Sequence, residues 1–403
     1  MSATIDTPQV TTISTESEAL RAADEFAASL QESVIERDRT GELPVRELER
    51  FDASGLLGLT VPERDGGPDL PVTTLAEVIR RIAAVDPAVA QAPQGHYLMV
   101  DVLSVWGSER QRRALFGEVL AGGRLGNALA ERGGHHAQDL STRVIRRGSG
   151  LRLSGRKYYC TGALTARWLG VSALDDDDRL VLAFVRRDGD GVTLDRDWNV
   201  MGQRATVSGG AAFEDAEIGF VVDYQHAFEV PQQLGARAQL VHAAIQVGIA
   251  RGALSDAHWF LTEKARPFFE AARGGWGQSA TADPHTTLRF GRLATRLRAA
   301  ETLLADAAAV QQEIGRRPDD EAHAARGSIS VAQAKAFASE TAVEIGSELF
   351  SMSGASAADE RYDLCRLWRN ARTHASHDPV DWKYHPAGNW FLTGTAPPNH
   401  GQL

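Results

Sequence analysis

Two histidines near the C-terminal end of the chain have a spacing at which they can act together. His374 and His377 lie in the segment THASHDP, residues 373–379, about one helical turn apart. Histidine titrates near the pH at which most enzymes work, so these imidazoles are candidates for giving and taking protons. Asp378 follows directly and is an alternative proton carrier. The residues alone keep both possibilities open.

Other motifs that could carry chemistry favour ordinary structure. His135 and His136 are adjacent but have no further ligands near them in sequence, so no metal site is predicted. The acidic run Asp175–Asp178 is typical of a solvated loop. Gly275–Ala280 resembles a relaxed dinucleotide-binding motif, yet it lies in a polar loop between predicted helices. No Walker loop, HExxH or GxSxG motif is present, so any cofactor must be held by another architecture.

Composition indicates a globular protein and excludes several partners. The chain has 403 residues, a length that allows two or three domains. Of these residues, 43% are hydrophobic and 24% are charged. The formal net charge of −10 argues against a nucleic-acid partner. No apolar run approaches the ~20 residues of a membrane span, and the N-terminus lacks a basic and apolar leader, so no membrane partner is expected. Cys160 and Cys365 are too few for a disulfide framework, which favours a cytoplasmic protein.

Helical periodicity dominates both ends of the chain. Thr15 and Glu18 form a capping-box pair before an apolar repeat at three- and four-residue spacing, which predicts a helix start. One long helix is predicted over Leu240–Leu261, where Gly248 and Gly252 would allow close packing against a neighbouring helix.

The middle of the chain has a different pattern. Short apolar runs broken by turn signals predict antiparallel strands between the two helical parts. Cys160 would point into the core of this part. The predicted domains are residues 1–125, an N-terminal α-helical domain, residues 126–235, a central β domain, and residues 236–403, a C-terminal helical bundle.

Five segments, in the same order along the chain, resemble the acyl-CoA dehydrogenase superfamily. They are Gly55–Glu63 with Gly66-Gly67, Asn127–Glu131, Leu153–Ala163, Met201–Arg204 with Ser208 and Phe213, and Ala334-Lys335 with Leu364–Arg372. The resemblance implies an α+β protein of the acyl-CoA dehydrogenase fold. Its parts would be an N-terminal helical domain, a central antiparallel β-barrel domain and a C-terminal four-helix bundle. It also implies a homotetramer with a flavin between the β domain and the bundle.

The segment Trp368–Val380 resembles one branch of that superfamily, the dibenzothiophene monooxygenases and the SfnB-like oxidoreductases. Where the dehydrogenases often have a catalytic Glu-Gly pair, this chain has Asp378-Pro379, with a shorter acid and a restricted backbone. The branch implies a two-component monooxygenase that takes FMNH2 from a separate flavin reductase. It would oxygenate a small, organosulfur substrate with O2 through a flavin C4a-hydroperoxide. The alternative is an FAD-dependent acyl-CoA dehydrogenase.

The same resemblance implies four catalytic residues. His377 would be the catalytic histidine, and His96 would be a second histidine in the pocket. Asn127 would donate a hydrogen bond to the flavin or its peroxide, and the Thr161 hydroxyl would face the flavin N5 edge. Gly95 departs from the dibenzothiophene enzymes, which have an aromatic residue there, so dibenzothiophene itself is not implied as the substrate.

Further residues are implied to hold the cofactor, together with Asn127 and Thr161. Tyr159 and Trp198 would pack on the isoalloxazine ring and the phosphate side, although plain core packing is the alternative. Ser208, and Arg266 of a neighbouring subunit, would meet the phosphate, unless Arg266 forms a salt bridge within the bundle. His374 would support the flavin or the substrate.

Overall fold

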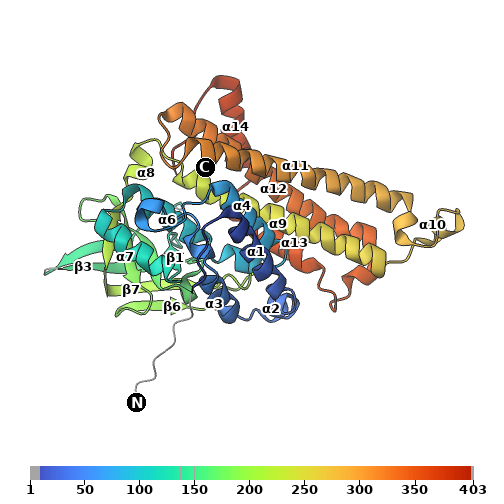
Figure 1. Ribbon diagram of the computed structural model, residues 1–403, viewed down its shortest axis with the longest axis horizontal. Coiled ribbons are helices and arrows are strands. Elements are labelled where there is room, and N and C mark those ends of the chain that lie inside the picture. The colour runs from blue at the N-terminus through green and yellow to red at the C-terminus, as the bar shows by residue number, and fades with distance from the viewer. Residues whose placement is uncertain (1–9, 137, 149, 401–403) are drawn as a thin grey trace, which may run out of the picture.

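The computed structural model describes residues 10–136, 138–148 and 150–400, and its helices and strands follow the predicted α, β, α order (Figure 1). The predicted domains at the two ends include residues 1–9 and 401–403, which lie outside the described residues. The N-terminal helices are α1 (Glu16–Leu30), α2 (Val34–Thr40), α3 (Val45–Ala53), α4 (Val72–Ala83), α5 (Pro87–Gln91), α6 (Gln94–Trp106) and α7 (Glu109–Leu120).

The predicted capping box at the first helix is confirmed. The Thr15 hydroxyl accepts a hydrogen bond from the Glu18 backbone N–H at 3.3 Å, and the Glu18 carboxylate accepts one from the Thr15 N–H at 3.0 Å. Two donors that a helix start leaves without partners are satisfied in this way.

The middle of the chain folds into a mixed sheet. Its strands are β1 (Leu125–Ala128), β2 (Arg143–Arg147), β3 (Gly150–Lys157), β4 (Trp168–Leu174), β5 (Leu180–Arg186), β6 (Val192–Asp195), β7 (Gly210–Glu217) and β8 (Phe220–Asp223). The strand order is β6-β7-β3-β2-β4-β5-β8, and β1 pairs with β4. Most pairs are antiparallel as predicted, but β1 runs parallel to β4, because the β2–β3 hairpin separates them and reverses the chain twice.

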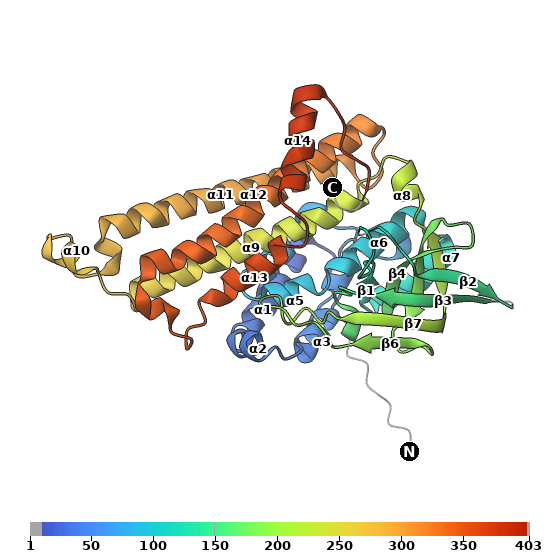
Figure 2. The same ribbon diagram turned by 180° about the vertical axis from the view of Figure 1, so that it is seen from behind.

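Long helices form the C-terminal bundle. They are α9 (Leu234–Glu263), α11 (Pro284–Ile314), α12 (Glu321–Ser353) and α13 (Cys365–Ala375), with the short helices α8 (His226–Glu229) and α10 (Phe269–Arg273) and the final helix α14 (Asp381–Thr393). The bundle extends away from the sheet, and α10 lies at its far tip (Figures 1 and 2). Within the described ranges, no helix combines the length and apolarity needed to cross a membrane.

Two apolar cores explain how these parts are joined. One core runs from the N-terminal helices into the bundle without interruption, because α4 and α6 pack against α9. A second core lies within the sheet and includes Cys160, which is fully buried as predicted. The helical parts therefore form one packed unit, and the sheet contacts it from the side.

Close packing of α9 on α4 confirms the role predicted for Gly248 and Gly252. A Cβ at Gly248 would lie 2.6 Å from the Arg80 carbonyl oxygen, and one at Gly252 would lie 2.3 Å from the Ala84 carbonyl oxygen. Neither distance is compatible with a side chain, so only glycine permits this helix spacing.

Substitution of Gly252 by alanine should destabilise the protein by about 1–3 kcal/mol, since the added methyl group overpacks the α4–α9 contact. Gly291→Ala on α11 is the matched control, because a Cβ there meets no atom within 4 Å. Alanine is the better helix former, so the control should be neutral or stabilising by up to about 1 kcal/mol. Urea unfolding of both variants measures the difference, and equal midpoints would contradict the packing argument.

Candidate active site between the sheet and the bundle

Three imidazoles meet where α13 ends beside α9. His374 is buried on α13, and its Nε2 lies 3.0 Å from Nδ1 of His242 on α9. The His242 ring also lies over His377, with 4.5 Å between ring centroids. His374 Nε2 is within 3.1 Å of the Gln91 side-chain oxygen at the end of α5. The predicted pair is thus a cluster of three histidines, His242, His374 and His377, called the histidine cluster below.

A carboxylate held by two lysines borders the histidine cluster. Asp378 Oδ1 is bound by Lys335 Nζ from α12, and Asp378 Oδ2 lies 2.5 Å from Lys383 Nζ of α14. Asp378 Oδ1 also lies 3.3 Å from His377 Nδ1. The two ammonium groups and the His377 hydrogen bond hold the pKa of Asp378 well below its usual range, although burial opposes them. Asp378 therefore stays ionised and is a poor proton carrier, which favours histidine.

The environment also keeps the three imidazoles neutral. Burial lowers the pKa of His242 and His374 well below the ordinary value, and the Lys335 ammonium adds to the effect. The pKa of His377 is also lowered, chiefly because neighbouring atoms remove water from the ring. The shift has this direction even though 44% of the side chain is accessible to solvent. Neutral imidazoles can accept a proton at one ring nitrogen and donate from the other. Within the described ranges, no three His, Cys, Asp or Glu side chains are grouped to hold a metal ion.

Asn127 faces the N-terminal helices from the end of β1. A Cβ at Gly95 on α6 would lie 2.7 Å from the Asn127 side-chain nitrogen, so the missing side chain at Gly95 makes room for the amide. The Asn127 backbone N–H donates to the Thr161 carbonyl oxygen at 3.4 Å, which sets the two predicted residues side by side. Asn127 Oδ1 is buried and has no hydrogen-bond partner among residues 10–136, 138–148 and 150–400.

Thr161 lies in the loop after β3 rather than in a strand. Its hydroxyl accepts a hydrogen bond from Ser208 Oγ at 3.2 Å, and Ser208 Oγ lies 2.7 Å from Thr206 Oγ1. Ser208 is buried. The predicted N5-edge residue and the predicted phosphate residue are therefore neighbours. In FMN the N5 atom belongs to the ring system and the phosphate ends the ribityl chain, so we expect only one of the two assigned contacts to form at this place.

The segment that carries Ser208 is tied to α13. The Gln203 backbone N–H donates to Asn370 Oδ1 at 2.7 Å, and a Cβ at Gly202 would lie 2.1 Å from the Arg369 carbonyl oxygen. Gln203 and Val207 have positive φ angles of 57° and 46°, which non-glycine residues rarely adopt. Both the oxygen and the nitrogen of the Gln203 side-chain amide are buried and have no hydrogen-bond partner in the part of the chain that the structure describes. Such strain and unpaired polar atoms are typical of a ligand site.

Tyr159 and Trp198 lie together at the edge of this loop. Their rings are 5.9 Å apart and nearly perpendicular, and Tyr159 is 52% exposed with a φ of 60°. The Trp198 indole N–H donates to the Gln203 carbonyl oxygen at 2.9 Å. An exposed ring beside a strained loop is more consistent with contact to a ligand than with core packing.

His96 lies deeper than a pocket histidine. It is fully buried, its Nε2 lies 2.9 Å from the Leu57 carbonyl oxygen, and its Nδ1 accepts a hydrogen bond from the Leu125 N–H at 3.2 Å. Both ring nitrogens are thus engaged by the backbone, and burial lowers the pKa of His96 to about 4. This geometry supports a role in holding β1, and with it Asn127, rather than in proton transfer.

Arg266 lies far from the other predicted residues of the same chain. It is exposed in the loop before α10, at the tip of the bundle, whereas the sheet lies at the other end of the molecule (Figure 1). Within one chain it cannot meet a ligand beside Ser208. A contact with the flavin would require a neighbouring subunit, as the prediction states.

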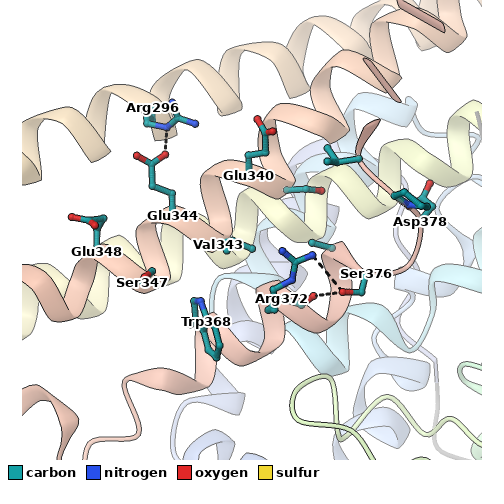
Figure 3. A pocket seen from close by; sticks show the side chains of 14 residues that line it. Arg296, Glu340, Val343, Glu344, Ser347, Glu348, Trp368, Arg372, Ser376 and Asp378 are labelled. Carbon is teal, nitrogen blue, oxygen red and sulfur yellow. Dashed lines mark hydrogen bonds and ion pairs between the residues drawn. The ribbon is translucent and has the colours of Figure 1, made fainter. Parts of the chain in front are cut away.

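A groove of about 770 Å³ between α11, α12 and α13 also borders Asp378 (Figure 3). Its glutamates have partners: Glu340 accepts from the Tyr384 hydroxyl at 2.7 Å, and Glu344 pairs with Arg296. His374 and His377 do not line it. The groove and the histidine cluster are therefore separate regions that both border Asp378.

Several residues of the site were missed by sequence reasoning. His242, Gln239 and Gln246 are buried polar residues of α9, and they occur at helical spacing in an otherwise apolar stretch. That pattern was the signal that could have found them, because buried polar groups need a reason. Lys335 and Gln203 lie in segments quoted for the family resemblance, but no role was assigned to them.

Comparisons with known proteins identify the family of this chain. The family profile of the acyl-CoA dehydrogenase N-terminal domain matches residues 14–123, and that of the C-terminal domain matches residues 240–382. The dibenzothiophene monooxygenase of Rhodococcus qingshengii is 31% identical over 389 residues, which are 92% of each chain. The chain therefore belongs to the acyl-CoA dehydrogenase superfamily, in the branch of the dibenzothiophene monooxygenases, and the predicted fold class is confirmed.

Two further relatives define the branch more closely. The SfnC protein of Pseudomonas putida, whose name describes an FMNH2-dependent monooxygenase, is 30% identical over 94% of this chain and 96% of its own. The crystal structure of FMN-bound TdsC from Paenibacillus sp. A11-2 superposes with a TM-score of 0.89 at 29% identity, covering 96% of this chain and 100% of TdsC.

The residues present fit an FMN ring. An isoalloxazine offers several ring nitrogens and carbonyl oxygens to neighbouring polar groups. Among the described residues, Asn127 Oδ1, His374 Nδ1 and the Gln203 amide are buried polar groups without a hydrogen-bond partner. Gly95 leaves room for the Asn127 amide, and the exposed Tyr159 supplies an aromatic face. A bound flavin would satisfy groups that are otherwise costly to bury.

Substitution of Gly95 by alanine should weaken FMN binding by about tenfold, roughly the value of one hydrogen bond, since the new Cβ displaces the Asn127 amide. Gly388→Ala on α14 is the control, because nothing lies within 4 Å of a Cβ there. A fluorescence titration with FMN measures both. Equal affinities would exclude Asn127 from the flavin site.

Acid should destabilise the protein through His96. The unfolded chain protonates this residue near pH 6.5, but the folded chain keeps it neutral down to about pH 4. The unfolded state therefore binds more protons in this window, and stability falls as the pH falls, by up to about 1.4 kcal/mol per pH unit. Urea unfolding at several pH values should show a smaller slope for His96→Gln than for the wild type. An unchanged slope in His96→Gln would be the contrary result.

Proposed function

We propose that this chain is an FMNH2-dependent monooxygenase that oxygenates a small organosulfur compound with O2. The observation that carries the proposal is the replacement of a free catalytic carboxylate by the histidine cluster. Asp378, at the position of the dehydrogenase base, is bound by Lys335 and Lys383 and is not available to abstract a proton. The names of the dibenzothiophene monooxygenase and SfnC support the same reaction class.

Reduced FMN, when bound, supplies the two electrons that allow O2 to deliver one oxygen atom to a substrate. The protein must then exclude water and move protons near the flavin. We assign proton transfer to His377, whose Nδ1 lies beside Asp378 and whose Nε2 has no hydrogen bond within the described part of the chain. Asn127 and Thr161 would hold the flavin on the opposite side, and His374 would support it from α13.

The remaining assignments concern the two faces and the ends of the flavin. Tyr159 and Trp198 would lie against the flavin, and Gln203 would join them as a polar contact. Ser208 would act through the Thr161 hydroxyl, and Arg266 would reach the phosphate of a flavin in a neighbouring subunit. Each site would then be completed by a second copy of the chain, as in the homotetramer that we propose. A separate reductase would supply FMNH2.

A dehydrogenase that uses FAD is the second candidate function, and the site argues against it. Such an enzyme needs a carboxylate with a proton affinity suited to base catalysis. The pKa of Asp378 is held far below that range by its lysine partners. Purified protein separates the two functions: a dehydrogenase should retain FAD and be bleached by an acyl-CoA, whereas the monooxygenase should consume O2 only with a reductase.

Substitution of His377 by alanine should leave FMN affinity within about twofold and divert turnover to H2O2, because the flavin contacts remain while proton transfer is lost. Loss of a general acid or base typically costs about 10²–10⁴-fold in rate. Oxygenated product and H2O2 are measured with a generic flavin reductase and a set of organosulfur compounds, read out by mass. Wild-type yields of product from His377→Ala would remove His377 from the mechanism.

A further inference from the structure

A buried ammonium group lies directly behind the histidine cluster. Lys335 is 3% exposed, and its Nζ binds both Asp378 Oδ1 and the Gln239 side-chain oxygen. Burial lowers the pKa of Lys335 to about 8, and Asp378 opposes this shift. At neutral pH the group is still mainly charged. A buried charge of this kind is expensive to maintain, so a specific use for it is expected.

Lys335 acts on His377 indirectly, through the carboxylate of Asp378. It anchors Asp378 Oδ1, the same oxygen that faces His377 Nδ1 at 3.3 Å. A carboxylate fixed in this position favours the tautomer with the proton on Nδ1, since that nitrogen can then donate a hydrogen bond. Nε2 is left as the acceptor.

We propose that Lys335 is a positioning residue for the oxygenation reaction: by anchoring Asp378 it fixes the His377 ring with Nδ1 at the carboxylate and Nε2 available for proton transfer. The inference rests on the proposed function. Lys335 itself does not need to touch flavin or substrate, because it acts through Asp378.

Charge adds a second effect to this geometry. The groups that face His377 are Asp378 beside it, Lys335 from α12, Lys383 from α14, His242 from α9 and His374 from α13. The Lys335 cation disfavours protonation of all three histidines. Removing it should raise the pKa of His377, because a repelling charge is lost and Asp378 keeps only one ammonium partner, Lys383. The acid limb of any activity that needs neutral His377 should then move to higher pH.

The direct test uses the flavin-free protein and does not depend on turnover. Histidine side chains labelled with ¹³C are titrated by NMR in the wild type, in Lys335→Met and in Lys335→Gln, with the His377 signal assigned from His377→Gln. Arg326→Met, which removes an exposed cation from the same helix α12, is the matched control. The titration midpoint of His377 should move to higher pH in both Lys335 variants and stay unchanged in the control.

Each outcome has a fixed meaning. An unchanged His377 midpoint in the Lys335 variants overturns the proposal, since both the Lys335 cation and the Asp378 carboxylate that it anchors face His377. If Lys335→Met fails to fold, Lys335→Gln carries the test, because its amide still offers a partner to Asp378. With a reductase present, we expect roughly tenfold less product per FMNH2 near pH 6 in Lys335→Gln and a smaller loss near pH 8. A wild type that titrates as expected but oxygenates nothing would refute the function and leave the role of Lys335 in place.

Discussion

The ion pair between Lys335 and Asp378 is the interaction on which the site depends. It joins α12 to the turn after α13, and it turns the one acidic side chain of that turn into a fixed anion. Everything that distinguishes this site from a carboxylate-based dehydrogenase follows from that pairing. In the proposed mechanism this anion holds a histidine instead of taking a proton, and proton transfer is assigned to imidazoles whose pKa values are lowered by their surroundings.

The two walls of the site are built by different means. The wall formed by α5, α9 and α13 belongs to the single helical core, and its polar side chains project from long, regular helices. The wall formed by the ends of β1 and β3 and by residues 201–208 is irregular, and hydrogen bonds that involve the side chains of Asn370, His96 and Arg204 hold it to α13 and to the N-terminal helices. Rigid helices suit groups that must be placed accurately, while loops with polar backbone suit the edge of a planar ligand.

Much of the fold was predictable because it rests on local patterns. Capping-box residues, apolar periodicity and the small residues of α9 gave helices and their contacts correctly. The pairing of β1 with β4 was not predictable, since strand neighbours are set by long-range packing. For the site, the sequence indicated the two histidines of α13. It could not show that His242 joins them from 132 residues away, nor that Asp378 is neutralised by lysines of two other helices. The depth of His96 was also hidden, because burial of both ring nitrogens depends on η1 (Leu56–Gly58) and β1 together.

The positive φ angles of Tyr159, Gln203 and Val207 have a consequence for evolution of this protein. Each such residue raises the energy of the folded state by of order 1–3 kcal/mol, and all three lie on the sheet side of the site. Glycine at any of these positions would relieve the backbone strain and make the folded protein more stable. It would also release the loop from the shape that a planar ligand requires. Selection for thermal stability therefore favours glycine at these three positions, whereas selection for turnover favours the residues that are present.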